Sequence, residues 1–325
     1  MKIKKSINVE EMIFNTLSNK LGTSSPTEIY NQLAYMYING EIFKIKEEKQ
    51  AKPIFRYIGQ KNNKLCKEIK SIESQVKYKT YVEPFAGSLA VLCSLDLSDD
   101  INIIVNDING RLTNFYKVIK EHSLEFLIAC DSIPYSQHVF DYARKSKVFE
   151  SDFEDAVAYF YEKFASYYSS STFHVAKNKN MAKSYRDNLK FIPALAKRLE
   201  NVTIINKDFK DVIKRYDSSD TLFYIDSPYW KTESFYNTDN IDECFDEEDH
   251  IALAKLLKNI EGRFIYSCRC NTNIYRLYRS NKHYSIDIRY SIRTSKTKNI
   301  REKLICNFKF LHFNCNGGMD VKQYK

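Results

Sequence analysis

The sequence predicts an α/β fold in which a mainly parallel β-sheet carries helices on both faces. Short apolar runs rich in β-branched residues alternate with segments of helical periodicity, and polar residues directly follow several of the runs. The chain has 325 residues, enough for one large α/β domain with smaller additional units. Because parallel sheets bind ligands at the carboxyl ends of their strands, we expect the functional residues directly after the predicted strands.

The predicted sheet is built from apolar runs that alternate with helices. One helix is predicted through Phe115 and Ile119, and another from His250 to Leu257. The runs predicted as strands are 81–85, 101–105, 202–205, 221–225 and 263–267.

Residues 1–50 are predicted to form a small separate unit. A helix is predicted over 9–20, and a second one begins after Ser25 and Pro26, which is a typical helix start, and ends at Gly40. Residues 42–46 then alternate apolar and basic residues like a short strand. This order is similar to a winged helix, a frequent DNA-binding module, although a helical pair packed against the main domain is the alternative.

The strand–helix alternation is interrupted between about 120 and 200. This segment is predicted to be mainly helical, is rich in aromatic residues, and continues into a polar, basic stretch. It is predicted to be an insertion with its own surface.

Composition and charge narrow the class of protein. The net charge of +9 is compatible with a polyanionic partner, but it also suits an ordinary basic protein. The 8 cysteines form no pair with zinc-site spacing, so we expect no metal. No run approaches the roughly 18 apolar residues of a membrane span, and the first residues lack the apolar stretch of a signal peptide. We therefore expect a cytoplasmic protein with reduced cysteines and no membrane partner.

Two segments are typical of a site for a nucleoside cofactor. Residues 82–91 lead from a strand through Gly87 into a helix, where a glycine lets the backbone approach a ligand. Asp107 follows the next strand, 20 positions later, and an acidic residue at that place commonly binds ribose hydroxyls. Taken singly, each segment is also explained without a ligand, the first as an ordinary turn and the second as a helix cap.

The most informative segment is Asp226-Ser227-Pro228-Tyr229, which directly follows the predicted strand 221–225. A base amino group is a poor nucleophile because its lone pair is delocalised into the ring. A carboxylate and a backbone carbonyl that accept its two hydrogens draw the lone pair out of the ring plane, and an aromatic side chain gives a flipped base a stacking face. Proline fixes the loop that carries these groups.

Taken together and in order, these segments resemble the Dam-type family of adenine-N6 DNA methyltransferases over roughly 53–308. The resemblance implies a Rossmann-like methyltransferase domain at 53–119 and 201–325, S-adenosylmethionine as cofactor, double-stranded DNA as partner, and a target-recognition insertion at 120–200. Catalytic roles fall on Asp226, Ser227, Pro228 and Tyr229. The residues implied in cofactor binding are Tyr57, Gly59, Lys61, Glu83, Pro84, Phe85, Ala86, Gly87, Ser88, Asp107, Asp208, Phe209 and Asp226. Those implied in DNA binding are Lys177, Lys179, Lys183, Arg186 and Arg293.

Three positions depart from the family pattern. Ser227 replaces a proline, Leu89 stands where many relatives have a glycine, and Gln60 replaces a small residue. None of the three removes a reacting group, so we expect an active enzyme.

Alternatives to this function remain open. One is a catalytically silent, methylase-like DNA-binding protein; another is a methyltransferase acting on RNA adenine or on the cytosine amino group. The basic residues of the insertion also suit a solvated surface. The sequence predicts neither the recognition sequence nor a partner nuclease.

Overall fold

A computed structural model describes residues 50–55, 61–146, 148–166, 172–230, 245–269, 271–290 and 298–310, together with Ser25. The predicted winged-helix-like unit at 1–50 lies outside the described residues, apart from Ser25 and Gln50. The described chain divides into two compact units, one holding residues 50–55 and 114–200 and the other 61–113 and 201–310.

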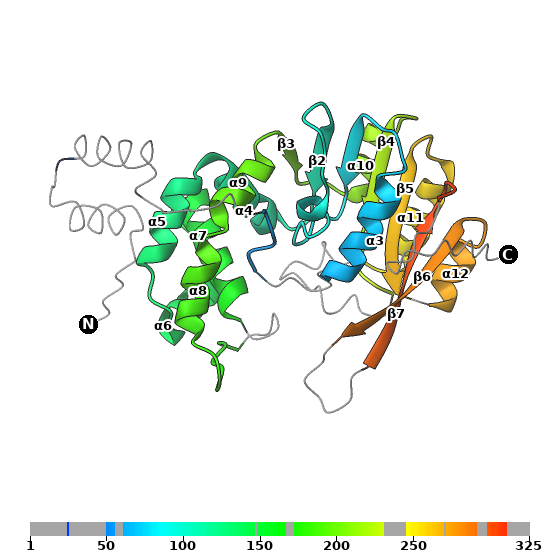
Figure 1. Cartoon of the computed structure of the whole chain (residues 1–325). Coiled ribbons are helices and arrows are strands. Elements are labelled where there is room, and N and C mark those ends of the chain that lie inside the picture. Colours follow the sequence, from blue (N-terminus) through cyan, green and yellow to red (C-terminus); the bar gives the residue numbers. More distant parts are fainter. Residues whose placement is uncertain are drawn as a thin grey trace. The chain divides into compact units, whose positions relative to one another are not determined.

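The second unit is built on a seven-stranded sheet of order β3-β2-β1-β4-β5-β7-β6 (Figure 1). The first five strands in this order pair in parallel, whereas β7 runs antiparallel to both of its neighbours. The strands are β1 (Thr80–Glu83), β2 (Asn102–Asn106), β3 (Val202–Ile205), β4 (Thr221–Ile225), β5 (Arg263–Arg269), β6 (Lys282–Tyr290) and β7 (Lys298–Cys306). The prediction of a mainly parallel sheet is confirmed, as are all five predicted strands; β6 and β7 were not predicted.

Helices cover both faces of this sheet because side chains alternate along each buried strand. On one face, Val82 and Phe223 pack against α10 (Phe209–Tyr216), α11 (Glu247–Asn259) and the short α12 (Thr272–Leu277). On the opposite face, Tyr224 lies near Cys66 of α3 (Asn63–Glu73), and α3 packs beside the short helix η1 (Leu92–Ser94).

Helix α4 (Gly110–Glu121) begins directly after β2. Its first turn is capped by Asn109, whose side chain accepts from the Leu112 amide at 3.0 Å. The cap fixes the direction in which the chain leaves the carboxyl end of β2.

The first unit contains the mainly helical part of the chain. Beyond the end of α4, its helices are α5 (Ser123–Ser132), α6 (Gln137–Lys145), α7 (Asp152–Ala165), α8 (Met181–Leu189) and α9 (Ile192–Leu199). Their shared core is aromatic, and the Phe160 and Tyr185 rings lie 5.9 Å apart. Tyr185 also donates its hydroxyl hydrogen to the Cys130 carbonyl at 3.0 Å, so the buried ring carries a satisfied polar group.

Two kinds of feature are absent from the described residues. Within them, no helix has the length and apolar character needed to cross a membrane. Nor does any cluster of three or more His, Cys, Asp or Glu side chains in the described ranges suit a metal ion.

Candidate active site

The carboxyl ends of three neighbouring parallel strands bring the predicted functional segments together. Val82 of β1 lies opposite Ile104 of β2 on one side and Phe223 of β4 on the other. Adjacent strands are about 4.8 Å apart, so the segments that follow β1, β2 and β4 emerge side by side at one edge of the sheet. The turn at Gly87, the segment at Asp107 and the loop from Asp226 to Tyr229 therefore share one edge.

The turn after β1 has an unusual backbone held by the segment after β2. Gly87 has a φ of 46° and Leu89 a φ of 57°, both in the left-handed region. The Gly87 amide donates to Asp107 Oδ2 at 2.9 Å, and the Ala86 amide donates to the Asn106 carbonyl at 2.7 Å. Asp107 Oδ1 accepts from the Asn109 amide at 3.0 Å, so the Asp107 carboxylate holds the Gly87 turn and the start of the next helix together.

Two asparagines that were not predicted as site residues lock the loops at this edge. Asn106 is buried, and its amide nitrogen donates to the Pro84 carbonyl at 2.9 Å and to the Lys207 carbonyl at 3.0 Å. Asn206 donates to the carbonyls of Asp107 and Ile108, at 2.8 and 2.9 Å. The sequence signal was an amide side chain at the end of each of two strands, but three of the four bonded carbonyls are about 100 residues away.

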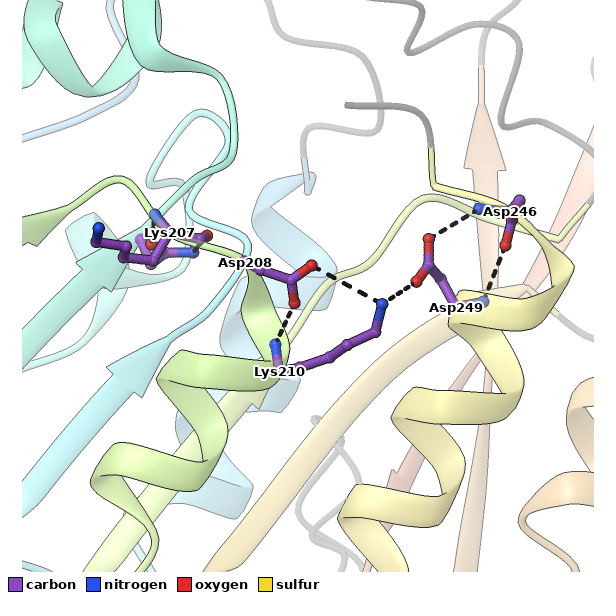
Figure 2. Close-up of polar contacts among 6 residues, drawn as sticks. Lys207, Asp208, Lys210, Asp246 and Asp249 are labelled. Atoms are coloured by element: carbon purple, nitrogen blue, oxygen red, sulfur yellow. Dashed lines mark hydrogen bonds and ion pairs between the residues drawn. The ribbon is translucent and has the colours of Figure 1, made fainter. Parts of the chain in front are cut away.

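The Asp208 side chain caps helix α10, as Figure 2 shows. It accepts from the Lys210 amide at 2.7 Å, while the Lys210 ammonium lies 3.8 Å from Asp208 and bonds Asp249 at 2.5 Å. Asp249 and Asp246 form the capping box of α11, so Lys210 links the first turns of the two helices. The Asp208 side chain stays 46% exposed and so remains open to a further hydrogen-bond donor.

Three phenylalanine rings pack together beside these loops. The Phe85 ring is 5.2 Å from the Phe209 ring and 5.6 Å from the Phe245 ring, measured between centroids. Ala86, Ser88 and Glu83 are buried, and Glu83 accepts from the Tyr81 hydroxyl at 2.7 Å. The Glu83 carboxylate therefore lies inside the protein at the end of β1.

The loop after β4 contains a buried polar chain. Lys61 is 5% exposed, and its ammonium hydrogen-bonds both Asp226 and the Tyr229 hydroxyl, the latter at 2.9 Å. The Tyr229 hydroxyl in turn donates to Oε2 of Glu302 at 3.0 Å. Lys61 therefore contacts two of the predicted catalytic residues, although the family resemblance implied a role for it in cofactor binding.

The Asp226 carboxyl is easier to protonate than an ordinary aspartate. Burial raises the pKa of Asp226 from 3.8 to about 6; nearby Lys61 opposes this shift, and Glu302 adds to it. The Asp226 side chain remains 22% exposed, so it is partly accessible to an incoming group.

Ser227 and Tyr229 are held by neighbours on β5. The Ser227 hydroxyl lies 3.2 Å from the Tyr266 hydroxyl, which anchors the position where relatives carry proline. The Tyr229 ring is only 6% exposed, and the Arg269 guanidinium carbon lies 5.6 Å from its centroid. Arg269 itself is exposed.

The remaining predicted residues fall elsewhere. Tyr57, Gly59 and Arg293 lie outside the described residues. Lys177 and Lys179 precede α8, whereas Lys183 and Arg186 lie on it; all four are exposed and belong to the helical unit rather than to the sheet unit. Leu89, which departs from the family pattern, is fully buried, so its side chain points into the core.

Glu302 is a further site residue that sequence reasoning missed. It lies on β7, opposite Arg269 of β5, 76 residues after Asp226. A single glutamate among nearby charged residues carries no local signal, and only the pairing of β7 with β5 places it beside Tyr229.

This combination of sheet and site is typical of Rossmann-like methyltransferases that act on the amino group of a base. The chain belongs to the D12 class of N6 adenine-specific DNA methyltransferases, whose family model matches residues 57–292. The family resemblance drawn from the sequence is therefore confirmed, and the reaction is methylation of adenine N6 in DNA.

Two named relatives agree with this assignment. The retron Ec67 DNA adenine methylase of Escherichia coli is 28% identical over 227 residues, which cover 66% of this chain and 77% of the relative. The type II methyltransferase M.MjaIII of Methanocaldococcus jannaschii is 26% identical over 242 residues, covering 66% of this chain and 82% of the relative.

Proposed function

We propose that the chain methylates the N6 amino group of an adenine extruded from double-stranded DNA, with S-adenosylmethionine as donor. The observation that carries this proposal is the position of Asp226. Its carboxylate directly follows β4, is held by Lys61 beside Tyr229, and shares a sheet edge with the Gly87 turn. An extruded base is required because the amino group is inaccessible to an enzyme inside the duplex.

The residues at this edge fit the proposed cofactor. S-adenosylmethionine, when bound, supplies an electrophilic methyl group on a sulfonium. We assign Asp107 to its ribose hydroxyls, since it follows β2 and holds the Gly87 turn, and Asp208 to its adenine amino group, since that side chain is half exposed. The positive φ of Gly87 lets the turn approach a ligand closely, and Phe85 offers an aromatic surface beside it.

We assign the chemical step to the loop after β4. Asp226 accepts one hydrogen of the adenine amino group, and the Ser227 carbonyl accepts the other, so the nitrogen lone pair turns out of the ring plane. Any residue supplies a backbone carbonyl, so serine in place of proline is compatible with activity. The main contribution to rate is the fixed geometry of the acceptors, because Lys61 and Tyr266 restrain the loop from both sides.

We assign base stacking to Tyr229. Because its ring is 6% exposed with Arg269 near one face, entry of the base requires the Arg269 side chain to move. Arg269 is exposed, so such a movement breaks no core packing.

We assign DNA backbone contacts to the mainly helical insertion. Lys177, Lys179, Lys183 and Arg186 are all exposed, as phosphate contacts must be, and Lys183 and Arg186 lie one turn apart on α8. The winged-helix-like unit at 1–50 is proposed as a further DNA-binding element, on its sequence pattern alone.

The test is methyl transfer by the full chain to genomic DNA from a strain without adenine methylation. We expect radiolabelled methyl incorporation, N6-methyladenine on nucleoside analysis, and one sequence context by single-molecule sequencing. DNA binding without transfer would favour the catalytically silent alternative. Label in cytosine, or transfer to RNA alone in a parallel reaction, would overturn the choice of substrate.

A further inference from the structure

Glu302 is a buried carboxylate to which no function has yet been given. It is 1% exposed and lies on β7, the strand that pairs with β5. Burying a carboxylate is costly unless hydrogen bonds compensate, so its contacts indicate why it is there. One of those contacts is the Tyr229 hydroxyl, at 3.0 Å.

This contact makes Glu302 one end of a four-residue chain. Tyr229 donates to Glu302 and accepts from Lys61 at 2.9 Å, and Lys61 also bonds Asp226. A phenol has one hydrogen to donate, so donation to Glu302 leaves its oxygen free to accept from Lys61. Glu302 thus sets the direction of the Tyr229 hydroxyl and, through it, the direction of the Lys61 ammonium.

We propose that Glu302 is a positioning residue for methyl transfer, fixing the Tyr229 ring and the Lys61–Asp226 pair through the Tyr229 hydroxyl. This inference rests on the proposed roles of Asp226 and Tyr229. In this proposal Glu302 acts through the Tyr229 hydroxyl and needs no contact with base or cofactor. It acts from β7 on three residues that precede it by more than 70 positions.

The same arrangement predicts an electrostatic effect on Asp226. The negative charge of Glu302 is among the causes that raise the pKa of Asp226. Among the described residues, Lys61, Cys66, Tyr224 and Tyr266 also interact electrostatically with Asp226. Removing the charge of Glu302 therefore lowers the pH at which Asp226 takes up a proton, which a purely structural role does not predict.

The test compares Glu302→Gln, Tyr229→Phe and the double variant in single-turnover methyl transfer to duplex DNA. We expect each single variant to lose about 10- to 100-fold in rate, the range for a hydrogen bond to a charged group, with unchanged affinity for S-adenosylmethionine by calorimetry. Adding Glu302→Gln to Tyr229→Phe should reduce the rate no further, and Glu302→Gln should move the acid limb of the pH–rate profile to lower pH.

The matched control is Glu154→Gln. Glu154 is a buried glutamate on α7 that accepts from the Tyr142 hydroxyl at the same distance of 3.0 Å, in the helical unit. Removing the Glu154 carboxylate should change neither the rate of methyl transfer per folded molecule nor the pH–rate profile. Circular dichroism confirms folding of each variant, and Tyr229→Phe keeps the test decisive if Glu302→Gln folds poorly.

The outcomes separate this inference from the proposed function. An active wild-type chain with an unchanged rate and pH profile in Glu302→Gln, or with fully additive losses in the double variant, overturns the role of Glu302 alone. A wild-type chain that binds S-adenosylmethionine but transfers no methyl group overturns the proposed function, and the role of Glu302 with it.

Discussion

At the scale of single residues, the raised pKa of Asp226 gives the proposed methyl transfer a dependence on pH. Its raised pKa, about 6, means that the folded protein holds this group protonated at pH 5 and ionised at pH 8. The folded-state pKa exceeds the ordinary value of 3.8, so ionising Asp226 costs stability. The favourable contribution of the Asp226 carboxyl to the free energy of unfolding is therefore present below pH 4. It is lost as the pH rises through 6.

We predict that methyl transfer falls as the pH drops through about 6. The proposed step uses the ionised carboxylate as a hydrogen-bond acceptor, and each pH unit below the pKa lowers the ionised fraction about tenfold. Single-turnover rates between pH 5 and 8 measure the effect, with cofactor affinity recorded at each pH. A rate that stays level down to pH 5 would contradict the proposed state of Asp226.

Replacement of Asp226 is the second prediction at this scale. Asp226→Ala should abolish detectable transfer, and Asp226→Asn should reduce it by about 100-fold or more, because an acceptor aimed at the reacting amino group is removed or weakened. Cofactor binding by calorimetry should persist in both. Asp96→Asn, which removes an exposed aspartate that also pairs with a lysine, is the control. Near-normal rates in Asp226→Ala would show that the proposed role of this carboxylate is wrong.

At the scale of elements, the turn between β1 and η1 combines backbone strain with a buried side chain. Leu89 has a φ of 57°, which costs an L-residue about 1 kcal/mol or more, yet its side chain is fully buried. Burial of a leucine outweighs that cost, since deleting such a side chain to alanine removes about 2–5 kcal/mol. The departure from the family's glycine is therefore accommodated by the core.

We predict an inverted order of stability for two variants of this residue. Leu89→Ala and Leu89→Gly both lose the buried side chain, but only glycine relieves the positive φ. Leu89→Gly should therefore be more stable than Leu89→Ala by about 1 kcal/mol, the reverse of the order in ordinary helices and strands. Urea unfolding monitored by circular dichroism measures both. A lower midpoint for Leu89→Gly would contradict the strained backbone at this turn.

The elements also show what the sequence could predict. The five parallel strands were predictable because each is a short buried run, and the segments after β1, β2 and β4 were predictable because parallel strands end at one edge. Strands β6 and β7 lie in a polar, charged segment, so their hydrophobic pattern is weak. The Lys61–Asp226 contact joins residues 165 positions apart, and Glu302 reaches the site only through strand pairing. Such long-range contacts leave no local signal.

At the scale of the whole molecule, positive charge is expected to govern DNA binding. We predict that changing Lys177, Lys179, Lys183 and Arg186 to glutamine weakens duplex binding at all sequences. The slope of log K against log salt should decrease by about 0.9 for each phosphate that these side chains no longer neutralise. Cofactor affinity should remain unchanged. Fluorescence anisotropy with labelled duplex at several salt concentrations measures the slope.

A control with the same change in net charge distinguishes a binding surface from general attraction. Three lysines and one arginine near the ends of α10 and α11 are also exposed, and these helices end at the edge of the sheet away from Asp226; they are Lys214, Arg215, Lys255 and Lys258. Replacing them with glutamine should leave the slope unchanged. Equal reductions in affinity for the two sets would assign the four basic residues of the helical unit to an ordinary solvated surface.

The position of β7 has a consequence for synthesis of the protein. In the sheet, β7 lies between β5 and β6 and pairs with both. In the sequence, it comes after both of them. Until residues 298–306 have been synthesised, β5 has one edge without a neighbour, and the Tyr229 hydroxyl has no Glu302 to donate to. A nascent chain, or one cut short by a premature stop before Lys298, would thus hold every predicted site residue and still lack the contact between Tyr229 and Glu302.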